Sequence, residues 1–154
     1  MDRDPKEKAT MKASRYDKDV IAWSQEQAQL LRSGRFSELD IEHLAEEIED
    51  VGKSEQRELA SRMAVLLAHL LKWQYQPGRR GANWQVTIKA QRAGIERRLA
   101  KTPSLQASLA DPDWWADAWG DAVVAAASET GLGSFPETCP WGVDQVLSTD
   151  WLPE

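Results

Sequence analysis

The chain is poor in cysteine, histidine and the smaller aromatic residues. Its 154 residues include one Cys, two His, two Phe and two Tyr. A single cysteine excludes an internal disulfide framework and a cysteine-based zinc finger. We therefore expect a fold without cross-links, because a chain of about 150 residues buries about two thirds of its unfolded surface.

Long apolar runs are also missing. No run approaches the roughly 18 residues that a membrane-spanning helix needs, and the charged residues 1–14 lack the apolar segment of a secretory signal. We expect a soluble cytoplasmic protein with its thiol reduced and no membrane contact. Residues 1–15 are predicted to form a mobile tail, and residues 16–152 a single helical domain.

Helical periodicity and capping signals dominate the remaining sequence. Apolar residues recur three or four positions apart, and no segment shows the alternation of a strand. Helices are predicted over 17–33, 103–109, 112–130 and 140–147. Others are predicted from a signal at one end: one begins after a capping box at 37–40, one ends before the Pro77-Gly78 stop, and one begins after Asn83. The sequence thus predicts an all-α, single-domain bundle of six or seven helices.

Gly52 interrupts the second predicted helix. Before it, one apolar stripe is predicted, which consists of Ile41, Leu44, Ile48 and Val51. Glycine costs about 1 kcal/mol inside a helix relative to alanine. Gly52 is therefore expected to mark either a helix break, with Ser54 capping a new helix, or a close contact between helices.

The most informative polar residues lie beside apolar stripes, at about 100° of helical rotation per residue. These candidates are Glu47, Glu55, Arg62, His69, Gln91 and Arg92. Burying such groups is costly unless they are paired, so a buried structural network is the simpler interpretation. The functional interpretation is a pocket between helices, in which His69 is the natural proton-transfer residue because its ordinary pKa is near neutrality.

A metal site and a catalytic cysteine find less support in the sequence. Carboxylate bundles that bind two metals repeat a Glu-x-x-His pair, whereas here His43 precedes Glu46 and no second copy exists. Cys139 is interpreted as a packed residue near a helix start, because an activated thiolate usually needs a neighbouring histidine. We predict no metal and no cofactor.

Charge is distributed in blocks along the chain. Residues 60–101 hold nine basic side chains and one acidic one, whereas residues 102–154 hold nine acidic side chains and no Lys or Arg. The basic segment 79–101 could bind a polyanion. We favour ion pairing within the protein, because acidic blocks flank the basic one, and we regard nucleic acid as an improbable partner.

Tryptophan is abundant, with eight residues. Trp23, Trp73 and Trp84 lie on apolar stripes and are predicted to be core. Trp114 points about 100° away from Trp115 on the same helix. A partner surface is therefore predicted there, which consists of Trp114, Asp111, Asp113 and Asp117.

Three stretches resemble a known family. LAEEIEDVGKSE at 44–55, HLLKWQYQP at 69–77 and ETCPW at 137–141 are together similar to the bacterial family known as domain of unknown function 29. The resemblance extends over about residues 16–152. It implies a small, all-helical, single-domain protein, and it implies no activity and no site residues.

These observations favour a non-enzymatic helical module that acts through protein contacts, with itself or with a small partner, because tryptophan is enriched at interface hot spots. The alternative is a small hydrolase-like or ligand-binding protein that uses Glu47, Glu55, Arg62, His69 and Arg92. A further alternative is polyanion binding through segment 79–101.

Overall fold

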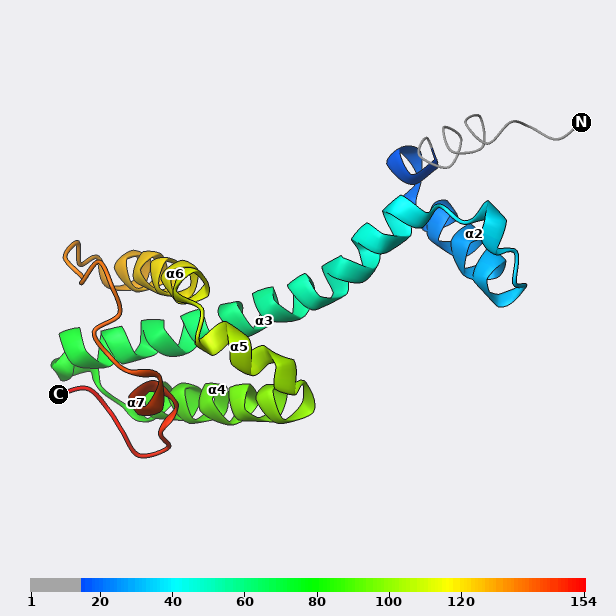
Figure 1. The fold of residues 1–154 in the computed structure, drawn as a ribbon. Helices are drawn as coiled ribbons and strands as arrows, with labels where there is room; N and C mark the ends of the chain where they lie inside the picture. Colours follow the sequence, from blue (N-terminus) through cyan, green and yellow to red (C-terminus); the bar gives the residue numbers. More distant parts are fainter. Residues whose placement is uncertain (1–14) are drawn as a thin grey trace, which may run out of the picture. The chain divides into compact units, whose positions relative to one another are not determined.

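Every regular element of the described residues is helical. The structure is a computed structural model that describes residues 15–154, and it contains no strand in that range. The helices are α2 (Val20–Arg32), α3 (Ile41–Tyr75), α4 (Ala82–Lys101), α5 (Gln106–Leu109), α6 (Pro112–Thr130) and α7 (Val143–Leu147) (Figure 1). Short 3-10 turns join them at η1 (Phe36–Glu38), η2 (Pro77–Arg79) and η3 (Pro103–Leu105). The predicted all-α fold class is confirmed.

The chain divides into two compact units. The N-terminal unit spans Met1–Lys53 and the C-terminal unit spans Ser54–Glu154. Apart from Arg15, the predicted mobile tail of residues 1–15 lies outside the described residues. The prediction of a single domain over 16–152 stays a prediction.

Helix α2 begins and ends at clear local signals. Residues 15–18 are helical, but the backbone at Asp19 is not, and the Asp19 carboxylate accepts the Ala22 N–H at 3.0 Å as an N-cap. Trp23, Gln27 and Leu30 are buried along one face, as their spacing of three and four residues requires.

Two predictions about helix α3, its start at a capping box and the role of Gly52, are wrong. The predicted capping box does not start it, because residues 36–38 form η1 and Leu39 is extended, so the helix begins at Ile41. It then continues to Tyr75 without a break at Gly52. A Cβ on Gly52 would meet no other atom within 4 Å, so this residue marks neither a break nor a close helix contact, and Ser54 caps no new helix.

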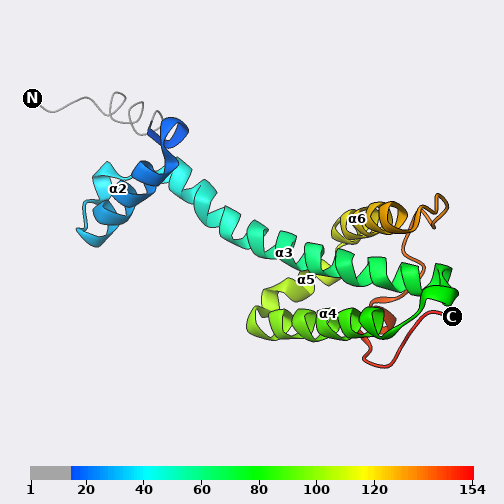
Figure 2. The ribbon, with the colours of Figure 1, turned by 180° about the vertical axis from the view of Figure 1, so that it is seen from behind.

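The C-terminal unit is built around the second half of α3, which lies between α4 and α6 in both views (Figures 1 and 2). Leu66, Leu67 and Leu70 of α3 are fully buried. The face of α6 that joins this core is made mainly of small residues, Ala118, Ala122 and Ala126, together with Trp119. Because alanine side chains are small, the Trp119 ring supplies most of the side-chain volume that α6 contributes to this core.

Helix α6 follows its sequence signals most closely. Asp111 caps it by accepting the Asp113 N–H at 2.9 Å, and Pro112 occupies the first turn. Gly131 ends it in the left-handed conformation, at φ +74°. The last predicted helix, over 140–147, is shorter than expected and covers only Val143–Leu147.

Among the described helices, none is both long and apolar enough to cross a membrane.

Candidate functional site

The N-terminal unit holds a buried polar cluster, here called the Asp40 cluster, which consists of Tyr16, Trp23, Gln27, Asp40 and His43. The Trp23 indole Nε1 donates to Asp40 Oδ2 at 2.9 Å, and His43 Nδ1 lies 2.8 Å from the same oxygen. The Asp40 backbone N–H donates to Gln27 Oε1 at 2.8 Å. The Tyr16 ring stacks on the His43 ring at 4.0 Å between centroids.

Hydrogen bonds raise the pKa values of two residues of this cluster, His43 and Tyr16. The bond with the Asp40 carboxylate raises the pKa of His43. The Tyr16 hydroxyl donates to Glu47 Oε1 at 2.6 Å, and this bond, which favours the neutral phenol, raises the pKa of Tyr16 to about 12. The interactions fasten residues 16–27 to the start of α3, so the cluster fixes the local geometry of the unit.

An apolar face of α3 lies uncovered beside this cluster. Ile41, Ile48 and Val51 are 69%, 70% and 67% exposed, although their spacing predicts a core stripe. The exposed carboxylates along the same stretch are Glu42, Glu46, Glu49 and Asp50. We call this surface the α3 face. A periodic apolar stripe needs a cover to be buried, and the described residues of the N-terminal unit provide none.

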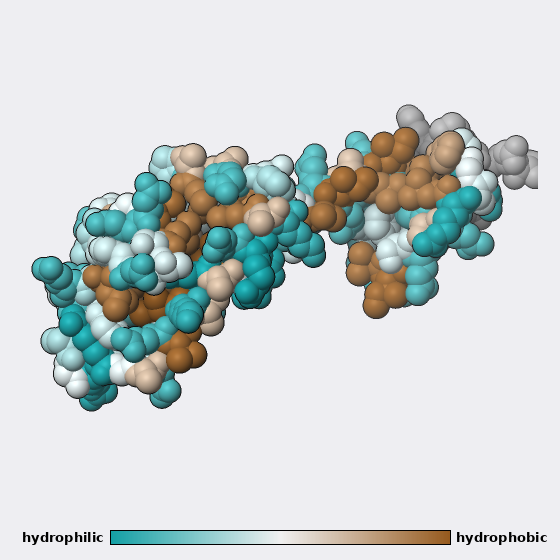
Figure 3. Space-filling model, turned by 90° about the horizontal axis from the view of Figure 1, so that it is seen from below, coloured by the Kyte–Doolittle hydropathy of each residue, from teal (hydrophilic) through white to brown (hydrophobic). Residues whose placement is uncertain are grey.

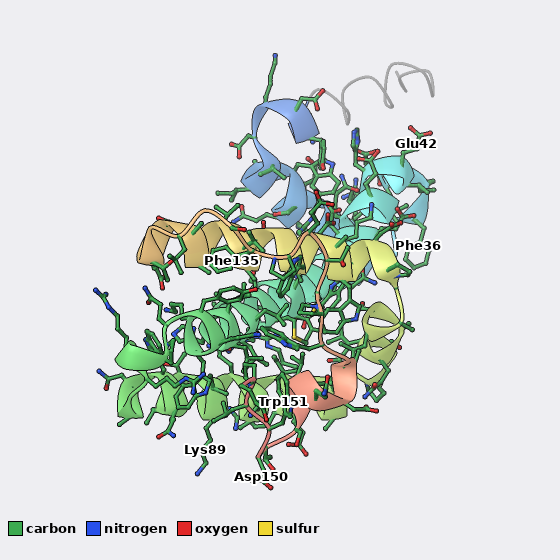
Figure 4. All side chains as sticks on the ribbon, turned by 90° about the vertical axis from the view of Figure 1, so that its left-hand side faces the viewer. Phe36, Glu42, Lys89, Phe135, Asp150 and Trp151 are labelled. Atoms are coloured by element: carbon green, nitrogen blue, oxygen red, sulfur yellow. The ribbon has the colours of Figure 1, made fainter. Side chains whose placement is uncertain are left out.

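More apolar side chains reach the surface of the N-terminal unit outside the α3 face. The further exposed ones are Val20, Ile21, Leu31 and Phe36. Hydrophobic surface is visible over this unit, at the right of Figure 3. Figure 4 shows the Phe36 and Glu42 side chains pointing outward from their backbone segments. The unit therefore buries little apolar surface and displays much of it, which is typical of an interaction site.

The six predicted pocket residues do not form one group. Glu47 belongs to the N-terminal unit, where it accepts the Tyr16 hydroxyl, and the others belong to the C-terminal unit. Glu55 and Glu58 lie 3.4 Å and 3.3 Å from the Arg98 guanidinium. Arg62 Nε lies 3.2 Å from Glu58 Oε1. Glu55 and Arg62 thus join one partly exposed group of ion pairs between α3 and α4.

His69 belongs to a second polar group with a partner that sequence reasoning missed, Lys72. His69 Nδ1 lies 2.8 Å from the Val65 carbonyl oxygen, and burial lowers the pKa of His69. Lys72 is buried, and its Nζ contacts the Glu129 carboxylate and lies 5.6 Å from the centroid of the Trp84 ring. The Lys72 bond lowers the pKa of Glu129. These contacts join His69, Lys72 and Glu129 in one polar group, and the role of His69 in a pocket stays a prediction.

Arg92 is buried and fastens the C-terminal segment to α4. Its Nε donates to the Val146 carbonyl at 2.8 Å, and its NH2 donates to the Trp151 carbonyl at 2.7 Å. Burial lowers the pKa of Arg92. Gln91 is half-buried, and its Oε1 has no hydrogen-bond partner among the described residues.

The grooves of the C-terminal unit include two that differ in size and lining. The larger of these two, of about 600 Å³, lies between α4 and residues 149–152, and Lys89, Arg92 and Asp150 line it. Figure 4 shows Lys89 and Asp150 at the same edge of the unit. The second, of about 420 Å³, is lined by Trp115, Trp119, Cys139 and Trp141, among others, and is called here the tryptophan groove.

The predicted partner surface lies at the start of α6. Asp111, Asp113 and Asp117 are exposed, whereas Trp114 is half-buried. Trp114 Nε1 donates to the Gln56 carbonyl at 3.1 Å, and its ring meets Trp115 edge to face. Trp114 therefore has a packing role within the C-terminal unit, and its role in binding a partner stays a prediction.

Several arginines of the predicted polyanion-binding segment 79–101 already have partners within the protein or are buried. Arg98 pairs with two glutamates, Arg92 is buried, and Arg80 Nε donates to the Trp73 carbonyl at 2.7 Å. Lys89, Arg97 and Lys101 remain exposed. Within residues 15–154, no three His, Cys, Asp or Glu side chains gather in a way that could hold a metal ion.

Sequence reasoning missed the Asp40 cluster, Lys72 and the tryptophan groove. A signal existed for the cluster, because Trp23 and Gln27 are four residues apart and Asp40 precedes a helix start. Comparisons with curated proteins and with solved structures give no match. The family model described as Domain of unknown function DUF29 matches residues 15–152, and the chain therefore belongs to that family, as its motifs suggested.

Proposed function

We propose that this chain is a protein-interaction module whose N-terminal unit binds a basic amphipathic helix of a partner protein through the α3 face. The observation that supports this is the exposure of Ile41, Ile48 and Val51 on a helix that is otherwise regularly amphipathic. A bacterial cytoplasmic setting is part of the proposal.

Apolar side chains at this spacing suit a helical partner. Residues three, four and seven positions apart lie on one face, and an amphipathic helix presents its own apolar side chains at the same spacing. Covering them removes apolar surface from water, which stabilises the complex by about 25 cal/mol for each Å² that is buried. The Asp40 cluster holds the start of α3 in place before binding, and such pre-organisation lowers the entropic cost of association.

Charge decides which helix is favoured. Between Ile41 and Gly52 the sequence has five carboxylates and no Lys or Arg. A partner with lysines or arginines beside its apolar stripe would complement this surface, whereas like charges disfavour an acidic helix. The same argument disfavours a second copy of the α3 face as the partner.

The test is a binding titration with designed helical peptides. A Leu/Lys peptide of about five turns and a matched Leu/Glu peptide are titrated into the full chain, with fluorescence anisotropy as the readout. We expect the basic peptide to bind and to weaken with added salt, and the acidic peptide not to bind. Replacing Ile48 and Val51 by Ser together should weaken binding at least about tenfold.

The matched control is Val124→Ser with Val86→Ser, since both residues are also exposed valines but lie in the C-terminal unit. This control should bind the basic peptide as the parent chain does. Equal weakening by the two double variants would contradict the proposal. A self-association that the Ile48 and Val51 replacements abolish, seen in sedimentation, would replace the foreign helix by a second copy and overturn the proposed partner.

A further inference from the structure

We propose that the tryptophan groove binds a small molecule that carries an alkylated ammonium group. The groove lies in the C-terminal unit and is independent of the α3 face. Its volume of about 420 Å³ falls within the range of about 300–1,000 Å³ that is usual for small-molecule sites.

Three indole rings line the groove from two segments of the chain. Trp115 and Trp119 are four residues apart on α6, and Trp141 comes from the irregular segment before α7. The rings of Trp119 and Trp141 stand at 87°, with centroids 5.7 Å apart. Trp119 is buried, whereas Trp115 and Trp141 are half-buried.

The rings are held rigidly before any ligand arrives. Trp115 Nε1 donates to the Leu109 carbonyl at 2.6 Å, and Trp119 Nε1 donates to the Pro136 carbonyl at 2.9 Å. Both indole N–H groups are thereby used inside the protein. The π surface that a ligand can reach belongs to the half-buried rings of Trp115 and Trp141, and such surface attracts cations most strongly in tryptophan.

The charge around the groove has one sign. Among the residues that line it, Glu137 is the one with a charged side chain, and that charge is negative. An anionic ligand would meet this field unfavourably. A bare ammonium would lose much of its strong hydration on entering an aromatic groove, whereas an alkylated ammonium is weakly hydrated and combines positive charge with apolar surface.

The proposal is tested with choline and its neutral isostere 3,3-dimethyl-1-butanol, which has the same shape without the charge. Each is titrated into the full chain by calorimetry, and the rate of Cys139 alkylation by iodoacetamide is followed in parallel. Cys139 lines the groove and is the only cysteine of the chain, so the rate of its modification reports occupancy of this site. We expect choline to bind at least about tenfold more tightly than the isostere and to slow the alkylation.

Two variants localise the binding. Ala116 is exposed and lines the groove, so Ala116→Arg should place a cation there and abolish choline binding, whereas Ala100→Arg on α4 should not. Glu137→Gln should weaken choline several-fold and leave the isostere unchanged, and Asp121→Asn is the control for the lost charge. Far-UV circular dichroism checks that each variant is folded.

Three outcomes would overturn the proposal. Equal affinity for choline and the isostere would show that the groove binds apolar groups without regard to positive charge. Choline binding that leaves Cys139 alkylation unchanged would place the ligand elsewhere, and no binding to the parent chain would remove the site.

Discussion

Asp40 and Trp23 are joined by a buried hydrogen bond, in which the indole Nε1 donates to Oδ2 at 2.9 Å. The same carboxylate pairs with His43. One side chain thus accepts the indole N–H of a residue on α2 and raises the pKa of a histidine on α3. In the described part of the N-terminal unit, the buried apolar residues are Trp23 and Leu30, so polar contacts such as those of Asp40 contribute much of its order.

Asp40→Asn should lower the pKa of His43 toward its ordinary value of about 6.5, because the amide carries no charge and cannot favour the imidazolium. It should also destabilise the N-terminal unit by about 1–3 kcal/mol, because an uncharged amide oxygen accepts hydrogen bonds from Trp23 and His43 more weakly than the carboxylate does. Histidine NMR titration measures the pKa, and hydrogen exchange in α2 measures the stability. Asp50→Asn changes an exposed residue of α3, the helix that carries His43, and should alter neither quantity. An unchanged His43 pKa in Asp40→Asn would contradict the assignment.

The two histidines should give opposite contributions to the pH dependence of stability. Burial lowers the pKa of His69 in the folded state, so its contribution falls as pH drops from the unfolded pKa of about 6.5 toward the lowered folded value. The raised pKa of His43 gives a contribution that is present below about 6.5 and is lost as pH rises through the folded value. Urea unfolding of the parent chain, His69→Gln and His43→Gln across this range measures both.

In that series, His69→Gln should remove the loss of stability at lower pH, and His43→Gln should remove the loss at higher pH. Identical pH profiles for the parent chain and the His69 variant would contradict the lowered pKa, because they would show that His69 has the same pKa in the folded and unfolded chain.

Arg92→Leu should release the C-terminal segment from α4. It removes two hydrogen bonds from a charged donor and leaves the Val146 and Trp151 carbonyls without it. We expect a destabilisation of roughly 1–3 kcal/mol and faster hydrogen exchange in residues 143–154, with no change in α2. The control is Arg97→Leu, which changes an exposed arginine of the same helix. Equal exchange in both variants would exclude this role of Arg92.

Gly52→Ala should stabilise the protein by about 0.5–1 kcal/mol, because alanine restricts the unfolded chain and favours helix. The position is helical, and a Cβ there meets no atom within 4 Å. Gly131→Ala is the opposite case, because this residue has a φ of +74° that alanine adopts only with strain. Chemical unfolding of the two variants should therefore shift in opposite directions; a destabilising Gly52→Ala would indicate that α3 bends at this residue.

For the polar candidate residues, the sequence predicts the helix face on which each one lies, but it does not predict their contact partners. Their helical angles placed Arg62, His69 and Arg92 beside apolar stripes, and in the structure Arg92 is buried whereas Arg62 and His69 are half-buried. The partners could not be derived in the same way, because Glu129 and Trp151 are 57 and 59 residues from the side chains they contact. Periodicity assigns a residue to a face of its helix, but it carries no information about which segment packs against that face.

The sequence by itself determined the all-helical class, the caps of α6 and the family, because these depend on neighbouring residues or on contiguous motifs. Only the tertiary structure decided which apolar stripes become core. Ile48 and Leu66 belong to stripes of the same helical spacing on one continuous helix, yet Leu66 is fully buried and Ile48 is 70% exposed. The difference arises because burial requires a second surface, and α4 and α6 provide that surface around Leu66, whereas no described segment covers Ile48.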